Sequence, residues 1–573
     1  MPSDILTTVI TQGFVLWGGL NGMSLCYCYI GRLFGFYHPS FNQLFLLVPW
    51  RPVWKAWLSF SQWKERVFHM GRKATAKWLG VLGVLCMVYR PDLMPLGRPL
   101  WFGFPLPQLA GTKLQRHAVM IAGTGAGKTT LLQTIIGLHR GAILAVDPKL
   151  QVFETMQTAR ESRGPVYALA PYNPDISSAW NVLDEIEAAI ERFGIDAAPR
   201  LFLKLAEATI LKEPNEKSFF PDTARDLWAG IVGYVYVTQP KECRNLVTAR
   251  NFLMEGLCPE EFDNPEDAFL FLLSEMQHCK ALNGFISKRA TAVKNASGNA
   301  SSDVFATART QTQWLDLPEV QHISQHSDFL LADLKIGKNP VSVFLGAPVT
   351  AIRGELSRWS RLVVETGLYL FETIPGNLKH PCLCALDEFP SLGRIESVET
   401  AAPLLRSYGV RLLVIAQDTE RLAQAYPHSW GGFLGNADIV WWMGTNHDPT
   451  AQYLERSLNQ TSRKEKISGG WFSKEPKRYQ HRERPLMYAD QIKRFLDPDS
   501  GNTIVTRFGK HPLKLRLTPY FKELPVWLYE PDPNFREALP RALFRKCIVH
   551  PLRKFRKEKS YEQQQPTVIR RTV

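Results

Sequence analysis

The chain has 573 residues, which is too long for one ordinary domain, so we expect two or three globular units with appendages. Its formal charge of +14 favours partners that carry phosphate, either nucleic acid or anionic lipid, and does not choose between them. The nine cysteines have neither zinc-site spacing nor the pattern of a secreted disulfide framework, which predicts a reduced, cytosolic main body.

The first apolar stretch, residues 5–30, has no charged residue and is long enough to cross a bilayer. It lacks the positive residues that precede the core of a signal peptide, so we expect a membrane anchor. The basic run at 51–77 should then face the cytoplasm, which fits either a tight hairpin of spans within residues 5–50 or a single span. We assign residues 1–95 to this anchor and its basic juxtamembrane segment; a buried apolar helix is the alternative.

A glycine-rich turn, AGTGAGKTT, joins the apolar run 117–121 to a helical pattern. It has the spacing of a P-loop whose first glycine is replaced by Ala122. Lys128 should reach the β- and γ-phosphates of ATP, and Thr129 should ligate Mg²⁺. An ordinary turn is the alternative, but strand, loop, Lys-Thr and helix occur in the order that nucleotide binding requires. The expected phosphate-binding residues are Ala122, Gly123, Thr124, Gly125, Ala126, Gly127, Lys128, Thr129 and Thr130.

Apolar runs suited to strands buried on both faces alternate with helical patterns through most of the chain. They lie at 142–146, 166–169, 341–345, 382–386, 411–416 and 439–443. This alternation predicts an α/β fold with a mainly parallel sheet covered by helices.

The strand signals stop between residues 187 and 312, where segments such as 208–211, 224–237 and 268–276 have helical periodicity. We therefore expect an all-α domain at 187–312 inserted into a nucleotide-binding domain at 96–186 and 313–530. From Arg541 onward the chain is polar and basic, so we expect residues 531–573 to be a flexible tail without a core.

The apolar run 383–386 ends in Asp387 and Glu388. A P-loop ATPase uses such a pair to place one carboxylate in the Mg²⁺ shell and the next beside the attacking water. Asp387 is therefore the expected metal residue, and Glu388 the expected general base. Gln417, at the end of a later apolar run, is suited to sensing the γ-phosphate and orienting water.

Arg406 lies just before that later run, in LLRSYG at 404–409. It could be an arginine finger that stabilises charge in the transition state of a neighbouring subunit. A surface arginine is the alternative.

At these motifs the chain resembles the type IV secretion coupling proteins of the TraG/TraD group, membrane-anchored ATPases of conjugation systems. The resemblance spans about residues 115–495 and rests on LDEFPSLGRIE, LLRSYGVRLLVIAQD, AVDPKLQVFE, SAWNVLDEI, SDFLLADLKIGKNPVSVFLGAP, NADIVWWMGTNHDPTAQYLERSL and RPLMYADQI. It implies a RecA-like motor domain, a helical insertion, an N-terminal membrane anchor and a homohexamer.

The family's nucleotide site maps onto Lys128, Thr129, Asp387, Glu388 and Gln417, and its trans-acting arginine maps onto Arg406. The implied cofactors are ATP and Mg²⁺. The implied location is the bacterial inner membrane, with the motor domain facing the cytoplasm.

One departure concerns the turn after the run 142–146. The family often has Asp-Pro-Lys-Gly-Glu there, whereas this chain has Asp147-Pro148-Lys149-Leu150-Gln151, which leaves the role of the turn open.

The resemblance predicts a ring that recruits single-stranded DNA with its attached relaxase, or protein effectors, and drives it into a type IV secretion channel. A double-stranded DNA pump of the FtsK/HerA kind is one alternative, and a docking hub for effectors that uses nucleotide only to hold its ring together is another. A candidate DNA contact interleaves aromatic and basic residues, with a solvated mobile loop as the alternative. Its residues are Arg463, Lys464, Lys466, Trp471, Phe472, Lys474, Lys477, Arg478, Tyr479, Arg482 and Arg484.

Overall fold

The structure is a computed structural model of the chain. It describes residues 87–101, 104–212, 219–294, 299–395, 404–468, 478–532 and 537–551, with residues 30, 32, 33, 38, 76–80, 83, 398 and 399. No helix among these residues combines the length and apolar character that a membrane span requires. Nearly all of the expected anchor at residues 5–30 lies outside the described residues.

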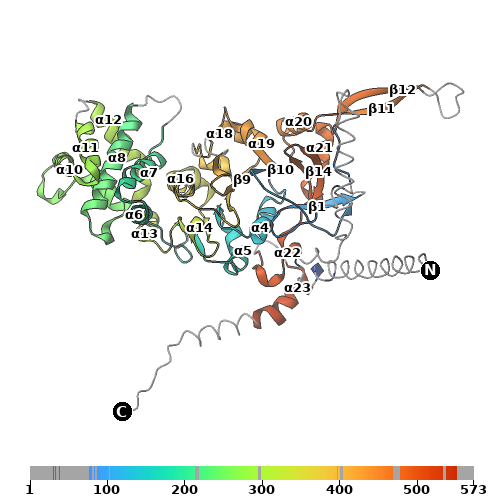
Figure 1. Ribbon diagram of the computed structural model, residues 1–573, viewed down its shortest axis with the longest axis horizontal. Helices are drawn as coiled ribbons and strands as arrows, with labels where there is room; N and C mark the ends of the chain where they lie inside the picture. The colour runs from blue at the N-terminus through green and yellow to red at the C-terminus, as the bar shows by residue number, and fades with distance from the viewer. Residues whose placement is uncertain are drawn as a thin grey trace, which may run out of the picture.

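A single large sheet forms the centre of the molecule (Figure 1). Its parallel strands follow one another in the order β10, β4, β9, β8, β5, β7 and β6. Their bounds are Ala437–Met443, His117–Ala122, Val410–Ala416, Cys382–Leu386, Ile143–Val146, Ser342–Leu345 and Val166–Leu169. Each apolar run that the sequence marks as a buried strand is one of these strands, so the expected parallel α/β sheet is confirmed.

Antiparallel strands extend the sheet beyond β10. They are β13 (Asn502–Arg507), β14 (Lys510–Arg516), β1 (Met94–Trp101), β2 (Phe104–Pro105) and β3 (Ala110–Thr112). The sequence analysis did not assign these strands, because they are short or broken by polar residues. Strands β1, β2 and β3 precede the P-loop in the chain, and β13 and β14 follow the last parallel strand. Together they extend the sheet on the β10 side.

Helices cover both faces of the sheet, and successive residues of β4 pack into different cores. Met120 packs in the core that includes residues of α4 (Lys128–Leu138) and α5 (Gln151–Glu161). Val119 and Ile121 pack in the core that includes residues of α16 (Ser357–Thr373). Burial on both faces explains why the parallel strands are continuous apolar runs.

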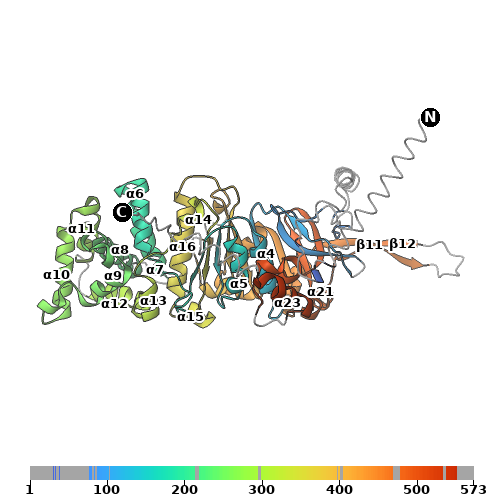
Figure 2. The ribbon, with the colours of Figure 1, turned by 90° about the horizontal axis from the view of Figure 1, so that it is seen from below.

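A helical unit occupies one end of the molecule, and α16 lies between it and the sheet (Figure 2). It comprises α6 (Val182–Phe193), α7 (Ala198–Thr209), α8 (Phe219–Thr238), α9 (Leu246–Glu255), α10 (Pro265–His278), α11 (Ala281–Lys294), α12 (Asn299–Gln311) and α13 (Pro318–Ile323). The helix expected at 208–211 is wrong beyond Thr209, because Ile210 is extended and its carbonyl accepts a hydrogen bond from Arg225. Helix α6 crosses the expected domain boundary at residue 187, so that boundary stays a prediction.

Shorter helices connect the strands or follow them. They are α14 (Asp333–Ile336), α15 (Val349–Arg353), α18 (Thr419–Ala425), α19 (Trp430–Asn436), α20 (Asp448–Ser457), α21 (Ala489–Phe495) and α22 (Tyr520–Glu523).

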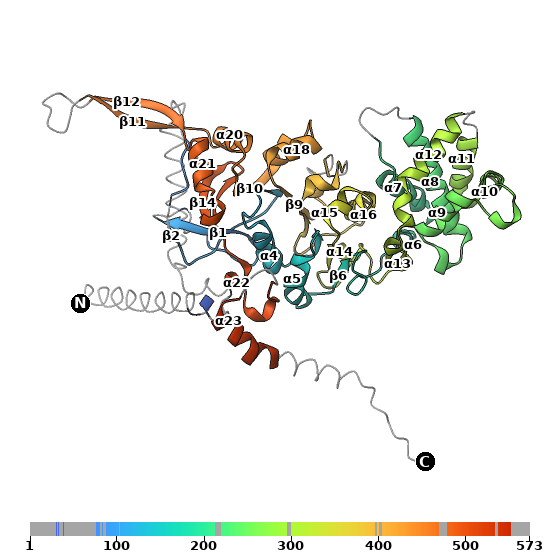
Figure 3. The same cartoon turned by 180° about the vertical axis from the view of Figure 1, so that it is seen from behind.

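A two-stranded hairpin, β11 (Gln460–Ser468) and β12 (Arg478–Pro485), projects from the end of the molecule away from the helical unit (Figures 1 and 3). Near the C-terminus, α23 (Leu539–Phe544) and a π-helical turn (Arg545–Val549) pack against the body. Arg545 is buried and donates to the carbonyls of Val526 and Tyr529. The expectation of a tail without a core is therefore wrong for residues 539–549, where Val549 is buried in the core that also includes residues of α4 and α5, and Arg545 bonds to backbone carbonyls.

Candidate nucleotide site

The P-loop leaves β4 at Ala122 and leads directly into α4. Gly125 and Gly127 have φ angles of 77° and 83°, which lie in the left-handed region that residues with a Cβ avoid. A Cβ at Gly123 would lie 2.0 Å from the carbonyl oxygen of Gly444, so this glycine is needed for close packing against the end of β10. Gly127 precedes α4 and supplies no side-chain cap, which leaves the positive end of that helix available to an anion.

Lys128 reaches across the carboxyl ends of the strands to the two acidic residues that follow β8. Its Nζ lies 3.0 Å from an Oδ1 of Asp387 and 2.5 Å from an Oε1 of Glu388. Burial lowers the pKa of Lys128, but the two carboxylates outweigh burial and raise it above its usual value. The lysine is therefore fully charged. It is held by Asp387, the expected metal residue, and by Glu388, the expected general base.

Glu388 contacts both Lys128 and Gln417. Its Oε1 also accepts a hydrogen bond of 2.9 Å from Nε2 of Gln417, the residue that follows β9. Burial raises the pKa of Glu388, but the hydrogen bonds from Lys128 and Gln417 outweigh it and lower the pKa overall. Glu388 is thus an ionised carboxylate at neutral pH, as a proton acceptor must be.

The backbone of Glu388 is in the left-handed region, with φ of 52°. This conformation is uncommon for a residue with a side chain and is concentrated at functional sites. It directs the chain sharply from β8 into the turn Phe389–Leu392.

Asp387 is 8% exposed, and burial raises its pKa above the usual value, against the lowering effect of Lys128. Thr129 is half-buried at the start of α4. Mg²⁺ prefers oxygen ligands. The Thr129 hydroxyl and the Asp387 carboxylate would supply two of them, and phosphate oxygens and water would supply the rest. The described residues contain no cluster of three or more His, Cys, Asp or Glu side chains for a metal, and this kind of site does not require one. The residues present therefore fit both a nucleoside triphosphate and its Mg²⁺.

The turn after β5, whose role the sequence left open, caps a helix. The Oδ2 of Asp147 accepts hydrogen bonds from the backbone N–H groups of Val152 and Phe153 in α5. Leu150 has φ of 53°, the conformation that glycine would adopt without strain. Its side chain is buried over Gly346, where a Cβ would lie 2.2 Å from Leu150 Cδ2. The family often has glycine where this chain has Leu150. Gly346, at the end of the neighbouring strand β7, leaves room for the Leu150 side chain.

Arg406 lies away from this cluster. It precedes β9, so it is at the amino end of the strand whose carboxyl end carries Gln417. The strand has seven residues, which places the two ends about 20 Å apart. The Arg406 side chain is exposed, and among the described residues it forms no hydrogen bond or ion pair. The structure therefore does not bring Arg406 to the P-loop of its own chain.

Sequence reasoning missed Arg421, in α18. Its charge contributes to lowering the pKa of Glu388, and its Nε lies 3.5 Å from Asp418 Oδ2. The available signal was its position four residues after Gln417, one helical turn into the element that follows the sensing strand.

The candidate DNA contact corresponds to the projecting hairpin. In register, Arg463 lies opposite Arg482, Lys464 opposite His481 and Thr461 opposite Arg484. Four residues of the expected contact, Trp471, Phe472, Lys474 and Lys477, lie outside the described residues.

Comparisons with known proteins give the same overall picture. A family model described as type IV secretory system conjugative DNA transfer matches residues 69–564. Protein VirD4 of Rhizobium rhizogenes is 26% identical over 447 residues, which are 74% of this chain and 61% of that protein. The type IV secretion system-coupling protein VirD4 of Bartonella henselae is 25% identical over 422 residues, 71% of this chain and 63% of that protein. The chain thus matches less than two thirds of the length of these relatives.

Among solved structures, the plasmid coupling protein TrwB in complex with ADP and Mg²⁺ matches with a TM-score of 0.56 at 14% identity. The match covers 78% of this chain and 96% of TrwB. At this identity the likeness shows the fold alone, and that fold is the RecA-like P-loop fold that the sequence predicts.

Proposed function

The chain belongs to the type IV secretory system conjugative DNA transfer family, and from this premise we propose that it is the ATPase that couples a transfer substrate to a type IV secretion channel. The proposed substrate is single-stranded DNA with an attached relaxase, and protein effectors are a second class that the same machine would accept. The relatives named as coupling proteins support this assignment. The basic composition supports a phosphate-bearing substrate.

The observation that carries the proposal is the contact of one glutamate with both the P-loop lysine and the glutamine after β9. Lys128 holds Glu388 at 2.5 Å, and Gln417 donates to the same carboxylate oxygen. A phosphate entering the P-loop competes for Lys128, since the β- and γ-phosphates carry more negative charge than one carboxylate. Glu388 then keeps Gln417 as its neighbour and becomes free to accept a proton from water.

In this proposal each residue has one task. Lys128 and the backbone N–H groups from Gly125 to Thr129 bind the phosphates, and Thr129 and Asp387 hold Mg²⁺. When bound, Mg²⁺ would supply positive charge that offsets the negative charge of the phosphates. Glu388 accepts the proton of the attacking water, which Gln417 orients.

We assign Arg406 to the nucleotide site of a neighbouring subunit. Its exposure at the opposite end of β9 supports a role across an interface. A ring of head-to-tail interfaces gives every subunit such a neighbour, so we propose a homohexamer. Hydrolysis at one interface can then move the neighbouring subunit in sequence.

We further propose that residues within 1–95 anchor the protein in the bacterial inner membrane with the motor domain facing the cytoplasm. The uncharged stretch at 5–30 and the basic run at 51–77 support this placement.

ATP turnover of the full-length protein with different DNA substrates tests the proposal. We expect single-stranded DNA to stimulate turnover, with stimulation falling steeply as salt is raised because the contacts are to backbone phosphates. Stimulation by double-stranded DNA alone would support the pump of the FtsK/HerA kind. Nucleotide binding without stimulated turnover would support the docking hub.

A further inference from the structure

The helical segment formed by α23 and the π-helical turn has an inverted distribution of side chains. Its buried face carries arginines, since Arg541 is 7% exposed and Arg545 is 4% exposed. Its outer face carries leucines one helical turn apart, with Leu539 72% and Leu543 52% exposed. A surface helix of a soluble domain normally has the opposite arrangement, with its apolar residues facing the core.

The buried arginines hold this segment in its orientation. Arg545 pairs with Glu537 at 2.9 Å and donates to the backbone carbonyl of Val526 at 2.9 Å. Arg541 donates to the backbone carbonyl of Arg32, also at 2.9 Å. A rotation that turned the leucines inward would break these hydrogen bonds and leave the carbonyls without their donors. The leucines are therefore held on the outside.

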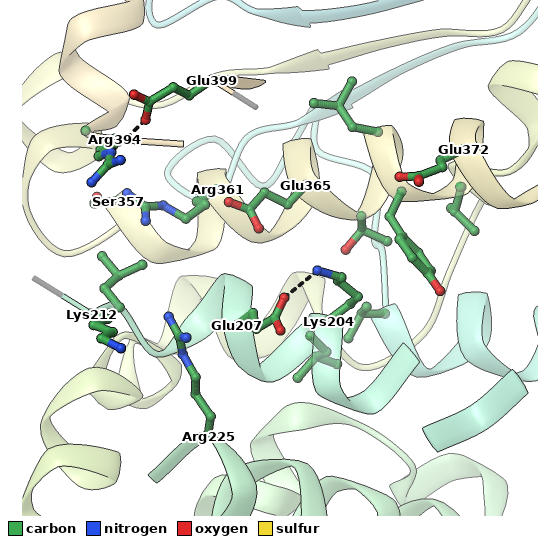
Figure 4. Close-up of a pocket in the computed structure, with 18 of the residues that line it drawn as sticks. Lys204, Glu207, Lys212, Arg225, Ser357, Arg361, Glu365, Glu372, Arg394 and Glu399 are labelled. Atoms are coloured by element: carbon green, nitrogen blue, oxygen red, sulfur yellow. Dashed lines mark hydrogen bonds and ion pairs between the residues drawn. The ribbon is translucent and has the colours of Figure 1, made fainter. Parts of the chain in front are cut away.

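A cavity at the other end of the molecule shows the usual arrangement, in which the chain satisfies its own side chains. It has a volume of about 1030 Å³ and lies between the helical unit and α16 (Figure 4). In its lining, Lys204 pairs with Glu207 and Arg394 pairs with Glu399. A single exposed leucine would need no explanation either. Two exposed leucines on one face of a helix with buried arginines form an apolar surface, which suits an apolar partner.

The uncharged stretch at 5–30 ends beside this segment. Arg32, two residues after the stretch, is 8% exposed. Its guanidinium donates to the carbonyl of Pro107 at 2.7 Å and pairs with Glu523 at 3.3 Å. Because Arg541 donates to the Arg32 carbonyl, α23 is bonded directly to the place where the stretch meets the body.

This contact places α23 at the membrane surface when residues 5–30 span the bilayer. Two residues of extended chain cover at most about 7 Å. The headgroup region of a bilayer is about 5–8 Å deep on each side. Ile30 and Leu33, each within two residues of Arg32, are 49% and 53% exposed, so exposed apolar side chains occur on both partners of the contact between Arg32 and α23.

The charges around the segment suit anionic headgroups. Lys546 is exposed, and the sequence continues into a run at 553–559 with five lysines or arginines and one glutamate. Two carboxylates of this region, Glu523 and Glu537, are already paired with arginines. Trp527, in the turn whose Val526 carbonyl accepts from Arg545, is 42% exposed. Tryptophan is enriched where proteins meet the membrane–water interface.

We propose that the outer face of the segment 539–549 docks onto a bilayer surface that contains anionic lipids. Leu539 and Leu543 then lie at the boundary between headgroups and acyl chains. This inference rests on the proposed membrane anchor within residues 1–95 and adds a second membrane contact to it. A span alone leaves the motor domain free to tilt about its connection, and the second contact fixes its orientation to the membrane.

Photo-crosslinking of the full-length protein in nanodiscs of phosphatidylethanolamine and phosphatidylglycerol tests this contact. A diazirine amino acid at Leu543 should form about fivefold or more lipid adducts than the same probe at Leu270, because only the first would lie at the acyl-chain boundary. Leu270 is the matched control, since it is a leucine of α10 in the helical unit and is 56% exposed. Equal lipid adducts at the two positions, or adducts of the Leu543 probe with a second copy of the chain, would overturn the proposal.

Alkaline extraction of the same membranes separates this proposal from the proposed anchor. Protein that stays in the membrane but forms equal lipid adducts at both positions contradicts the docking of α23 and leaves the anchor intact. Protein that alkali releases contradicts the anchor, and the docking with it.

A double variant, Leu539→Ser with Leu543→Ser, tests whether the leucines make the contact. With the probe at Ile548, lipid adducts should fall about threefold or more because apolar area is lost from the interface. Leu270→Ser should leave these adducts unchanged. In detergent without lipid, the thermal midpoint of the double variant should stay within about 2 °C of wild type, as for exposed residues. A larger fall would show that the leucines pack within the chain, and unchanged adducts would show that they do not touch lipid; either result overturns the proposal.

Discussion

The two ends of strand β9 differ in almost every physical respect. At the carboxyl end, Gln417 bonds to Glu388, which also holds Lys128, so that three side chains from distant parts of the chain form one half-buried cluster. At the amino end, Arg406 is exposed and without a partner among the described residues. One end is a cluster of three hydrogen-bonded polar side chains, and the other presents a single charge outward.

In the proposed ring, this difference would divide the active site between neighbouring subunits. The groups that bind and activate the substrate must be held rigidly, and they share hydrogen bonds within one chain. A group that acts only when a neighbour is in place must be accessible, and an unpaired surface arginine meets that need at little cost to stability. Substitutions at the two ends of β9 should therefore impair the protein in different ways.

The largest expected effect is at the amino end. Arg406→Ala should still bind nucleotide and lose turnover by on the order of 10³, because stabilisation of transition-state charge from the neighbour is missing. Mixed with Lys128→Ala, it should recover part of the activity, since some interfaces then pair an intact P-loop with an intact arginine. ATPase assays on the mixture and on each variant alone measure this.

The mixing experiment needs proof that the rings contain both variants, which differently tagged subunits supply. No recovery from such rings would argue for a purely structural arginine. A titration of either variant into wild type would reveal whether turnover needs several intact neighbouring sites.

At the carboxyl end, Glu388→Gln should reduce turnover about a hundredfold or more, because the amide cannot accept the proton of water. Nucleotide binding should be retained, since the side chain keeps its shape and Lys128 is intact. The control is Glu420→Gln on α18, an exposed carboxylate that contacts His447 and should leave turnover unchanged. Hydrolysis by Glu388→Gln at the wild-type rate would show that another residue is the base.

For the free energy of unfolding, the larger effect is expected at the carboxyl end of β9. Lys128→Met leaves Asp387 and Glu388 without their shared cation, so we expect a loss of about 1–3 kcal/mol in the free energy of unfolding. Arg406→Ala should change it by less than about 0.5 kcal/mol, as for an exposed residue. Thermal unfolding of both variants without nucleotide gives the comparison, and equal losses would contradict it.

The last effect concerns pH and comes from neither end. Glu185 is buried, accepts hydrogen bonds from Trp180 and from the backbone N–H of Ala332, and burial raises its pKa to about 7. Because the folded state holds this proton more tightly than the unfolded state, stability should fall as pH rises from about 4.5 to 7. One group gives a slope of at most about 1.4 kcal/mol per pH unit.

Glu185→Gln should flatten that part of the profile, as measured by thermal midpoints between pH 4.5 and 8. An unchanged profile would mean that Glu185 is ionised in the folded protein. Comparisons of Lys128→Met with Arg406→Ala are therefore sharpest at a fixed pH near 8.

The parts of the fold with local signals could be predicted from the residues alone. Strands buried on both faces must be apolar throughout, so β5, β7, β8, β9 and β10 could be read from their runs. The P-loop and the Asp387-Glu388 pair were identified because backbone curvature and phosphate chemistry require particular residues at adjacent positions. Strand β1 is interrupted by two prolines and a glycine, and β14 is mostly polar, so neither carries such a local signal. Each pairs with a neighbouring strand of the sheet.

How these parts meet depends on the packing of segments that are distant in the chain. The strand order β4, β9, β8 brings Lys128 to Glu388, which is 260 residues away in the chain. Arg406 lies at the opposite edge of the sheet, where β9 begins. Leu150 tolerates a left-handed backbone because Gly346 leaves room for its side chain. Arg361 of α16 looks like any helical arginine in the sequence, and only tertiary packing buries its Nε without a hydrogen-bond partner. Distances across a sheet and the burial of a charge depend on which segments become neighbours, and no local pattern of residues specifies that.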